Sequence, residues 1–226
     1  MKCLLCNCPL AVHFSLSDLF TLTRIQTDSL CKDCRQRFVP YDLNKNCCCG
    51  CGHPAGGSSL CQECLKWKQQ FGRVLHHQPL FHYNDAMAEY MSQYKFQGRY
   101  QLRMAFQQQV QITIAHYDYD LLVPIPVSKN TWQTRGFNQV EGLIEDLKFV
   151  RLLSTIDDYK TRQSSRSRQE RLATAQPFCL AANVQVTGQS VLLVDDVYTT
   201  GRTLYHAADL FWQAGCQHVK SLSLAR

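Results

Sequence analysis

Hydrophobic and polar positions divide the chain into two parts with different patterns. Up to residue 70, little regular periodicity is present apart from a helix-like stretch at residues 14–25. From residue 71 onward, apolar runs of strand length alternate with stretches whose apolar residues recur at helical spacing. Strands that alternate with helices are typical of an α/β domain with a mainly parallel sheet. The sequence therefore predicts a small module over residues 1–70 followed by an α/β domain over residues 71–226.

The individual elements of the α/β part follow from these patterns. Strands are expected at residues 74–83 (a strand or a hairpin), 120–127, 150–153, 190–194 and 219–224, and helices at residues 85–95, 102–115, 137–147 and 203–214. The run at residues 191–194 contains only apolar residues, which is typical of a strand buried on both faces of a parallel sheet.

Cysteines are concentrated in the first part of the chain. Of the 13 cysteines, all but Cys179 and Cys216 lie between Cys3 and Cys64. Four C-x-x-C pairs supply eight candidate ligands: Cys3, Cys6, Cys31, Cys34, Cys48, Cys51, Cys61 and Cys64. Two such pairs can surround one tetrahedral Zn²⁺, whereas disulfides would require an oxidising compartment that no targeting signal supports. We therefore predict structural zinc, whose binding supplies folding energy that so small a core lacks.

The spacing leaves the pairing of these cysteines open. The first pair can join the second and the third pair the fourth, or the pairs can be cross-braced as first with third and second with fourth. Cys8, Cys47 and Cys49 are alternative ligands.

Composition and charge narrow the class of protein. A content of 45% hydrophobic and 19% charged residues in 226 residues excludes a disordered chain. No apolar run approaches the length of a transmembrane helix, and the first residues lack an apolar signal core, so a cytoplasmic protein is expected. The net charge of +6 is mild, but residues 160–171 carry five Lys or Arg side chains against one Glu. This basic segment is expected to form a mobile loop that attracts polyanions.

The segment SVLLVDDVYTTGRTL, residues 190–204, carries the most specific chemistry. Its apolar strand delivers Asp195 and Asp196 to the carboxyl edge of the sheet, where open α/β sheets bind their ligands. The turn that follows contains Thr199, Thr200, Gly201, Arg202 and Thr203 and leads into a helix, whose first N–H groups favour a phosphate. Such residues are also common in ordinary turns and helix caps. Their combination favours a sugar phosphate, with the carboxylates accepting hydrogen bonds from ribose hydroxyls.

Two motifs resemble known families. VLLVDDVYTTGRT resembles the 5-phosphoribosyl-1-pyrophosphate (PRPP) binding motif of type I phosphoribosyltransferases, and VPIPVSKNTWQTRGFNQVEGL, residues 123–143, is similar to a signature of the ComF family. With the cysteine pairs, the resemblance covers nearly the whole chain and implies a type I phosphoribosyltransferase-like domain preceded by a zinc module. It implies that Asp195 and Asp196 bind the ribose of PRPP and that residues 199–203 bind its 5′-phosphate.

The resemblance also implies a second half of the site. The turn at residues 125–128, which includes Val127 and Ser128, would hold pyrophosphate, with Lys129 and Arg135 as neighbouring cations and Mg²⁺ bridging pyrophosphate and ribose oxygens. In an active enzyme, Asp195 or Asp196 could accept a proton. The basic segment falls where the family's catalytic flexible loop lies.

Two functions of different classes are compatible with these residues. The resemblance implies a late-competence protein that binds PRPP and single-stranded DNA during DNA uptake in natural transformation, beside a DNA-translocating helicase of the ComF operon type. The alternative is an active phosphoribosyltransferase that transfers ribose-5-phosphate from PRPP to an unidentified acceptor. Independent features that favour DNA binding are the basic segment, the cations Lys95, Arg99 and Arg103, and the aromatic residues Trp67, Tyr94, Phe96 and Tyr100. Core packing is the more common role for such aromatic residues.

Overall fold

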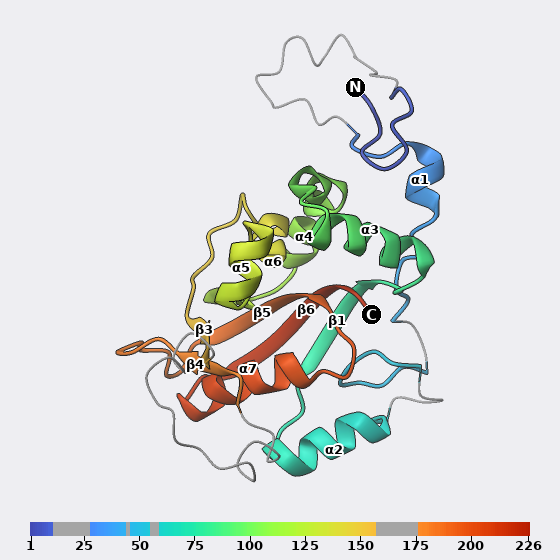
Figure 1. Cartoon of the computed structure of the whole chain (residues 1–226). Helices are drawn as coiled ribbons and strands as arrows, with labels where there is room; N and C mark the ends of the chain where they lie inside the picture. The colour runs from blue at the N-terminus through green and yellow to red at the C-terminus, as the bar shows by residue number, and fades with distance from the viewer. Residues whose placement is uncertain (11–27, 44–45, 55–58, 157–175) are drawn as a thin grey trace, which may run out of the picture.

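A parallel four-stranded sheet forms the centre of the molecule (Figure 1). The computed structural model describes residues 1–10, 28–43, 46–54, 59–156 and 176–226. The strands are β1 (His76–Phe81), β2 (Leu121–Pro124), β5 (Ser190–Val197) and β6 (His218–Ala225). They lie in the order β1-β6-β5-β2, and every neighbouring pair is parallel. The parallel sheet expected from the alternating pattern is therefore confirmed.

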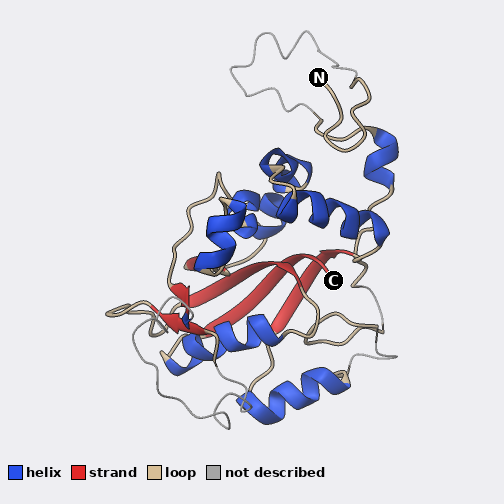
Figure 2. Cartoon of the chain, in the orientation of Figure 1, coloured by secondary structure: helices blue, strands red, loops and turns tan. Residues whose placement is uncertain are grey.

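Helices cover both faces of this sheet (Figure 2). One face carries α3 (Asp85–Phe96), the 3₁₀ helix η2 (Tyr100–Ala105), α4 (Gln107–Ile114), α5 (Lys129–Arg135) and α6 (Gln139–Leu143), and the other carries α7 (Arg202–Gln213) and α2 (Gln62–Phe71). Because successive residues of a strand point to opposite faces, Leu192 and Val194 belong to the hydrophobic core on the α3 side, whereas Val191 and Leu193 belong to the core on the α7 side.

Several elements differ from the sequence expectations. The helix expected at residues 102–115 is divided into η2 and α4, because the backbone of Phe106 leaves helical geometry with φ −129°. The helix expected at residues 137–147 is confined to α6, which begins after the N-cap Asn138. β2 ends at Pro124, two residues before Pro126, which has no N–H to donate to a neighbouring strand. The region expected to be a strand at residues 150–153 forms β3 (Leu153–Thr155), which pairs antiparallel with β4 (Phe178–Leu180), an element the pattern did not indicate.

The cysteine-rich residues contribute to the hydrophobic cores on both sides of the sheet. Near α1 (Lys32–Gln36), Cys3 and Cys34 are buried in the core on the α3 side. Cys48, Cys51 and Cys64 are buried in the core on the α7 side. The cysteine-rich part of the chain thus contributes to the same two cores as the α/β part.

Two sequence expectations fall outside the described residues, namely the helix-like stretch at residues 14–25 and the basic segment at residues 160–171. Among the helices that the structure describes, none combines the length and the apolar character that crossing a membrane requires.

Candidate functional site

The two adjacent aspartates lie at the carboxyl end of β5, as the apolar run predicted, but inside the strand rather than after it. β5 continues to Val197 because Asp195 and Val197 pair with Ser223 and Ala225 of β6. Both aspartates are buried, with exposed fractions of 7% and 5%. Because consecutive strand residues point to opposite faces, Asp196 lies on the α3 side of the sheet and Asp195 on the α7 side.

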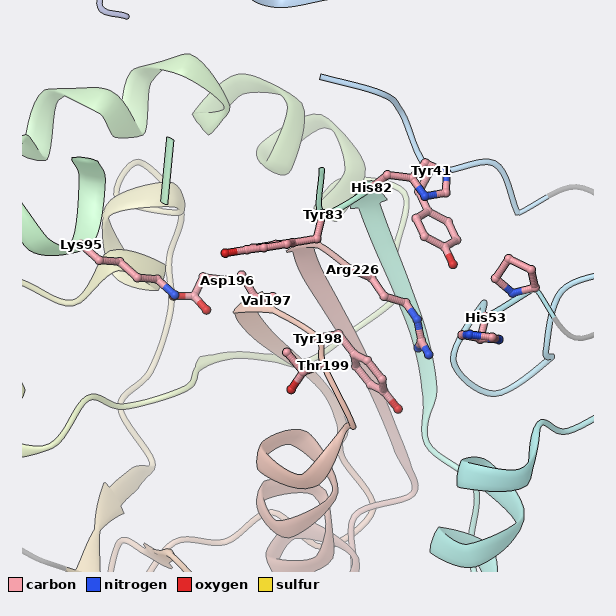
Figure 3. Close-up of a pocket in the computed structure, with 11 residues that line it drawn as sticks. Tyr41, His53, His82, Tyr83, Lys95, Asp196, Val197, Tyr198, Thr199 and Arg226 are labelled. Carbon is pink, nitrogen blue, oxygen red and sulfur yellow. The ribbon is translucent and has the colours of Figure 1, made fainter. Parts of the chain in front are cut away.

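Asp196 is neutralised by a cation from α3. Lys95 Nζ lies 2.7 Å from Asp196 Oδ2, and the Lys95 side chain is only 18% exposed (Figure 3). The sequence predicted that Lys95 belongs to a basic surface that favours DNA binding. In the structure its ammonium group instead contacts the carboxylate of Asp196. No local pattern indicates this contact, since it depends on how α3 packs across the end of the sheet.

Asp195 occupies a different electrostatic environment. Its Oδ1 accepts a hydrogen bond of 2.8 Å from the backbone N–H of Asp196. Burial, followed by the negative charge of Asp196, raises the pKa of Asp195 to about 7, although that hydrogen bond and the charge of Lys95 oppose the rise. Asp195 therefore changes its protonation state near neutral pH.

The turn between β5 and α7, for which the sequence predicts phosphate binding, is tightly constrained at Gly201. Gly201 is the N-cap of α7 with φ +84°, in the left-handed region that favours glycine. A Cβ atom at this position would lie 2.2 Å from Tyr198 Oη, so the close approach also requires glycine. Thr199, Thr200 and Thr203 are exposed around it. The first turn of α7 offers N–H groups that lack helical partners, and the helix dipole favours an anion there.

The turn after β2 lies beside this loop, because β2 and β5 are adjacent parallel strands. Ile125 N–H donates to Val194 O (2.9 Å), and Asn138 Nδ2 donates to Ile125 O (3.0 Å), which fixes the course of the turn. Ser128 caps α5 by accepting a hydrogen bond from Thr131 N–H (3.2 Å). Val127 is half-buried in the same turn.

The two cations expected near this turn differ in their surroundings. Lys129 is exposed at the start of α5. Arg135 is half-buried at the end of α5, where it donates to Gln139 Oε1 and its guanidinium lies 5.7 Å from the centroid of the Phe96 ring. Burial lowers the pKa of Arg135, and the negative charge of Asp196 opposes this effect. Arg135 therefore lies within electrostatic reach of Asp196.

Two groups of four cysteines have the geometry of metal centres. The sets are Cys3, Cys6, Cys31 and Cys34, and Cys48, Cys51, Cys61 and Cys64, with all sulfur atoms of a set within 4.8 Å of one another. The Sγ atoms of Cys6 and Cys31 lie 3.6 Å apart, as do those of Cys51 and Cys61. Four sulfurs at about 2.3 Å from a central zinc would be about 3.8 Å apart, so the donors fit such an ion. The first C-x-x-C pair therefore lies with the second, and the third pair lies with the fourth, which is the sequential one of the two pairings that the spacing left open. None of the 13 cysteines forms a disulfide.

Other residues that the sequence offered for DNA binding have partners inside the protein. Arg99 donates to Leu4 O and to Gln93, and Arg103 Nε donates to Glu145 Oε2 (2.7 Å). Tyr94 is fully buried, which agrees with the core role that is more common for such residues. Phe96, in contrast, is 77% exposed.

Trp67 is held against the candidate phosphate loop. Its Nε1 donates a hydrogen bond of 2.8 Å to the backbone oxygen of Thr200, and its ring stacks on Tyr205 of α7. The sequence indicated only an aromatic residue at position 67. It could not indicate the contact with Thr200, because the two residues are 133 positions apart in the chain.

Comparisons with known proteins agree with this architecture. The family model "Phosphoribosyl transferase domain" matches residues 134–226. Competence protein ComFC of Streptococcus pneumoniae is 36% identical over 226 residues, which cover 100% of both chains. Competence protein ComFC of Bacillus subtilis is 31% identical over 231 residues, covering 99% of this chain and 94% of the relative. DNA utilization protein YhgH of Escherichia coli is 27% identical over 242 residues, covering 99% of this chain and 96% of the relative.

Proposed function

Because this chain belongs to the family of competence protein ComFC and contains a phosphoribosyltransferase domain, we propose that it acts in DNA uptake during natural transformation and binds PRPP through that domain. The observation that carries the proposal is the continuity of β5, the turn at residues 198–201 and α7. It joins two buried carboxylates to a glycine-containing loop at a helix N-terminus.

Each part of PRPP has candidate partners in this arrangement. Asp195 and Asp196 would accept hydrogen bonds from the ribose hydroxyls, and Thr199, Thr200, Gly201, Arg202 and Thr203 would surround the 5′-phosphate. The neighbouring turn with Val127 and Ser128 would face the pyrophosphate, with charge support from Lys129 and Arg135. Mg²⁺, which prefers carboxylate and phosphate oxygens, would supply further neutralisation of the pyrophosphate.

Binding at Asp196 requires a rearrangement of charge. Lys95 now occupies one carboxylate oxygen, so a ribose hydroxyl must share Asp196 with it or displace it. A bound pyrophosphate would provide an alternative anion for the Lys95 ammonium group. We therefore expect ligand binding to change the Lys95–Asp196 ion pair.

Zinc is the metal that we propose for both cysteine groups, since four thiolates in a tetrahedral arrangement favour it. The first group would fix residues 1–10 against α1, and the second would fix the loop around Gly50 against the start of α2. The role of zinc in both groups would be structural, because four protein ligands leave no open position on the ion.

Single-stranded DNA is the proposed macromolecular partner. The names of the relatives support it, and Phe96 and Trp132 offer exposed aromatic faces (77% and 49% exposed) on the side of the molecule that carries Arg135. The proposal predicts that Phe96→Ala weakens the anisotropy change of labelled oligothymidylate, and an unchanged titration curve would contradict it. A DNA-translocating helicase as a second partner stays a prediction of the family resemblance.

Transfer of ribose-5-phosphate to an acceptor is the alternative function. In that reaction Lys129 and Arg135 would stabilise the leaving pyrophosphate, and Asp195 or Asp196 would accept a proton from the acceptor. A pKa near 7 suits Asp195 for this role. Release of pyrophosphate from PRPP, measured with and without candidate acceptors, distinguishes transfer from binding alone.

The decisive experiment is calorimetric titration of the metal-loaded protein with PRPP and Mg²⁺. Asp196→Asn is expected to reduce affinity by at least about tenfold, since a charge-assisted hydrogen bond contributes about 1.5–3 kcal/mol. The exposed Asp118→Asn is the matched control and should bind as the parent protein does. Metal analysis of the same samples should give two zinc ions per chain, both retained in Asp196→Asn. Equal PRPP affinity in the two variants would refute the proposed site.

A further inference from the structure

We infer that the buried imidazole of His77 is a positioning residue for the candidate phosphate loop, residues 198–203, because it supports the Tyr198 ring against which this loop packs. The inference rests on the proposed function, since the loop is the one that would hold the 5′-phosphate of PRPP. His77 belongs to β1, which is separated from β5 by one strand of the sheet.

The His77 side chain is held in one orientation. It is only 6% exposed, and both ring nitrogens have partners on β6. Nδ1 lies 3.0 Å from Ser221 Oγ, and Nε2 lies 3.0 Å from Ser223 Oγ. The backbone N–H of His77 donates to Gly50 O (2.7 Å), which fixes the strand at this residue. The imidazole therefore cannot turn without breaking hydrogen bonds that are buried and expensive to lose.

The hydroxyl groups also determine which nitrogen carries the proton. Ser223 Oγ donates its single proton to Ala225 O (2.9 Å), so it accepts from His77 Nε2–H. Nδ1 is then the acceptor for the hydroxyl of Ser221, whose other acceptor, His76 O, is more distant at 3.4 Å. Burial lowers the pKa of His77 well below its ordinary value, which keeps the ring neutral. The network thus specifies one tautomer as well as one orientation.

The ring of His77 reaches the phosphate loop through Tyr198. The two ring centroids are 4.2 Å apart with an interplanar angle of 29°. Tyr198 follows β5 directly and is 3% exposed (Figure 3). Its Oη would lie 2.2 Å from a Cβ atom at Gly201, so Tyr198 packs directly against the glycine at the N-cap of α7. In a close-packed interior, displacement of the imidazole is expected to displace Tyr198 and with it the loop.

The same network lies beside the strand that carries the aspartates. Ser221 pairs with Leu193 of β5, and Ser223 pairs with Asp195. Paired residues of neighbouring parallel strands point to the same face, so the His77 network shares the α7 face with the side chain of Asp195. One fixed group therefore adjoins both the strand position of a candidate ribose ligand and the loop for the phosphate.

The test is calorimetric titration of the full metal-loaded chain with PRPP and Mg²⁺. His77→Leu removes the stacking on Tyr198 and both side-chain hydrogen bonds, whereas Ser221→Ala is a milder change that removes only the donor to Nδ1. Each should raise the dissociation constant of PRPP by about 2–10-fold, the range expected for one aromatic pair or one hydrogen bond. Ile114→Val and Ile114→Ala, in the core on the α3 side, are controls that cover a range of melting temperatures and should bind PRPP as the parent protein does.

A second measurement follows the loop without ligand. The N–H groups of Tyr198 and Tyr205 donate to Ala225 O and Gly201 O, both at 2.9 Å, so their hydrogen exchange reports opening on either side of the loop. Exchange measured by NMR should be about 2–10-fold faster in His77→Leu and Ser221→Ala than in the Ile114 variant of nearest melting temperature. A residue that only fills the core would lower the melting temperature without this local difference.

The outcomes separate this inference from the proposed function. If the parent protein binds PRPP but both variants keep its affinity, or the Ile114 controls lose as much, the role of His77 is refuted and the PRPP site stands. If the parent does not bind PRPP, the proposed function fails, and faster exchange in the variants still supports His77 as the residue that positions the loop. Exchange that is no faster than in the controls refutes the role of His77 whatever the affinities. If His77→Leu does not fold, Ser221→Ala decides in each case.

Discussion

Replacing Trp67 with phenylalanine is expected to weaken PRPP binding, although Trp67 is not placed in contact with the ligand. The indole Nε1 donates to Thr200 O at 2.8 Å, inside the turn proposed to hold the 5′-phosphate. The ring stacks on Tyr205 with centroids 5.2 Å apart and an interplanar angle of 20°. Phenylalanine retains most of the stacking and removes the N–H donor, so Trp67→Phe tests the hydrogen bond specifically.

The size of the effect follows from the lost hydrogen bond. A typical intramolecular hydrogen bond contributes about 0.5–1.5 kcal/mol net. If this bond holds Thr200 in the binding conformation, its whole contribution appears in the binding free energy. The dissociation constant of PRPP should then rise by about 2–10-fold. Calorimetric titration with PRPP and Mg²⁺ measures this change directly.

A matched variant separates positioning from general packing. Trp212 also packs against Tyr205, with ring centroids 6.3 Å apart, but it lies near the far end of α7. Trp212→Phe should lower the melting temperature to a similar degree and leave PRPP affinity unchanged. Equal loss of PRPP affinity in both variants, or no loss in Trp67→Phe, would refute a positioning role for Trp67.

The second cysteine group provides an independent readout. Cys61 and Cys64 lie at the start of α2, the helix that carries Trp67. Removal of metal should therefore loosen α2 and weaken PRPP binding in the parent protein. In Trp67→Phe the same treatment should have a smaller effect on PRPP affinity, because the connection to Thr200 is already absent. Additive effects of chelation and substitution would contradict this route of coupling.

Two further predictions concern the aspartates and the glycine of the loop. The folded protein retains a proton on Asp195 up to about pH 7, whereas the unfolded chain releases it near 3.8, so stability should fall as the pH rises through this range. Asp195→Asn keeps the acceptor for Asp196 N–H and should raise the melting temperature of the ligand-free protein, more at pH 8 than at pH 5. The corresponding gain in the free energy of unfolding is roughly 1.4 kcal/mol for each unit by which the pKa of Asp195 is raised. An equal or lower melting temperature of the variant at pH 8 would contradict the burial argument. Gly201→Ala would place Cβ 2.2 Å from Tyr198 Oη at φ +84° and should destabilise the fold by about 1–3 kcal/mol. Gly98→Ala, at φ +66° with no atom within 4 Å, is its control in thermal unfolding and should cost less; equal losses would show that the contact with Tyr198 is unimportant.

The candidate site was predictable where its signal is local and unpredictable where it depends on distant contacts. The apolar run before Asp195 and Asp196 predicted a buried strand, and β5 has that burial. The sequence did not indicate that β5 continues through both aspartates, because charged residues usually end a buried strand. The continuation depends on the pairing of Asp195 with Ser223, a residue 28 positions later in the chain.

Lys95 illustrates the same limit for side chains. Its position near the end of an amphipathic helix predicted an exposed cation, and the surrounding Arg99 and Arg103 predicted a basic surface. In the structure these three cations have partners from different parts of the chain, namely Asp196, Leu4 and Glu145. Helical periodicity identifies the polar face of α3, but the packing of α3 across the sheet determines which acid the face meets.

The two cysteine groups show how a local motif acquires a function that its own residues do not encode. Their sulfur pairs were evident from spacing, yet the first group packs into the core on the α3 side and the second into the core on the α7 side. The chain between them must therefore pass the edge of the sheet, where Tyr41 N–H donates to Leu80 O (2.8 Å) and His82 N–H donates to Val39 O (2.9 Å). This pairing brings the ring of Tyr41 against that of His82, and both rings line a cavity of about 690 Å³ that extends to Asp196 at the carboxyl end of β5. Metal bound in both cysteine groups would restrain the segment of chain between them. The cysteine groups would therefore influence the shape of this cavity, although they do not supply most of its lining.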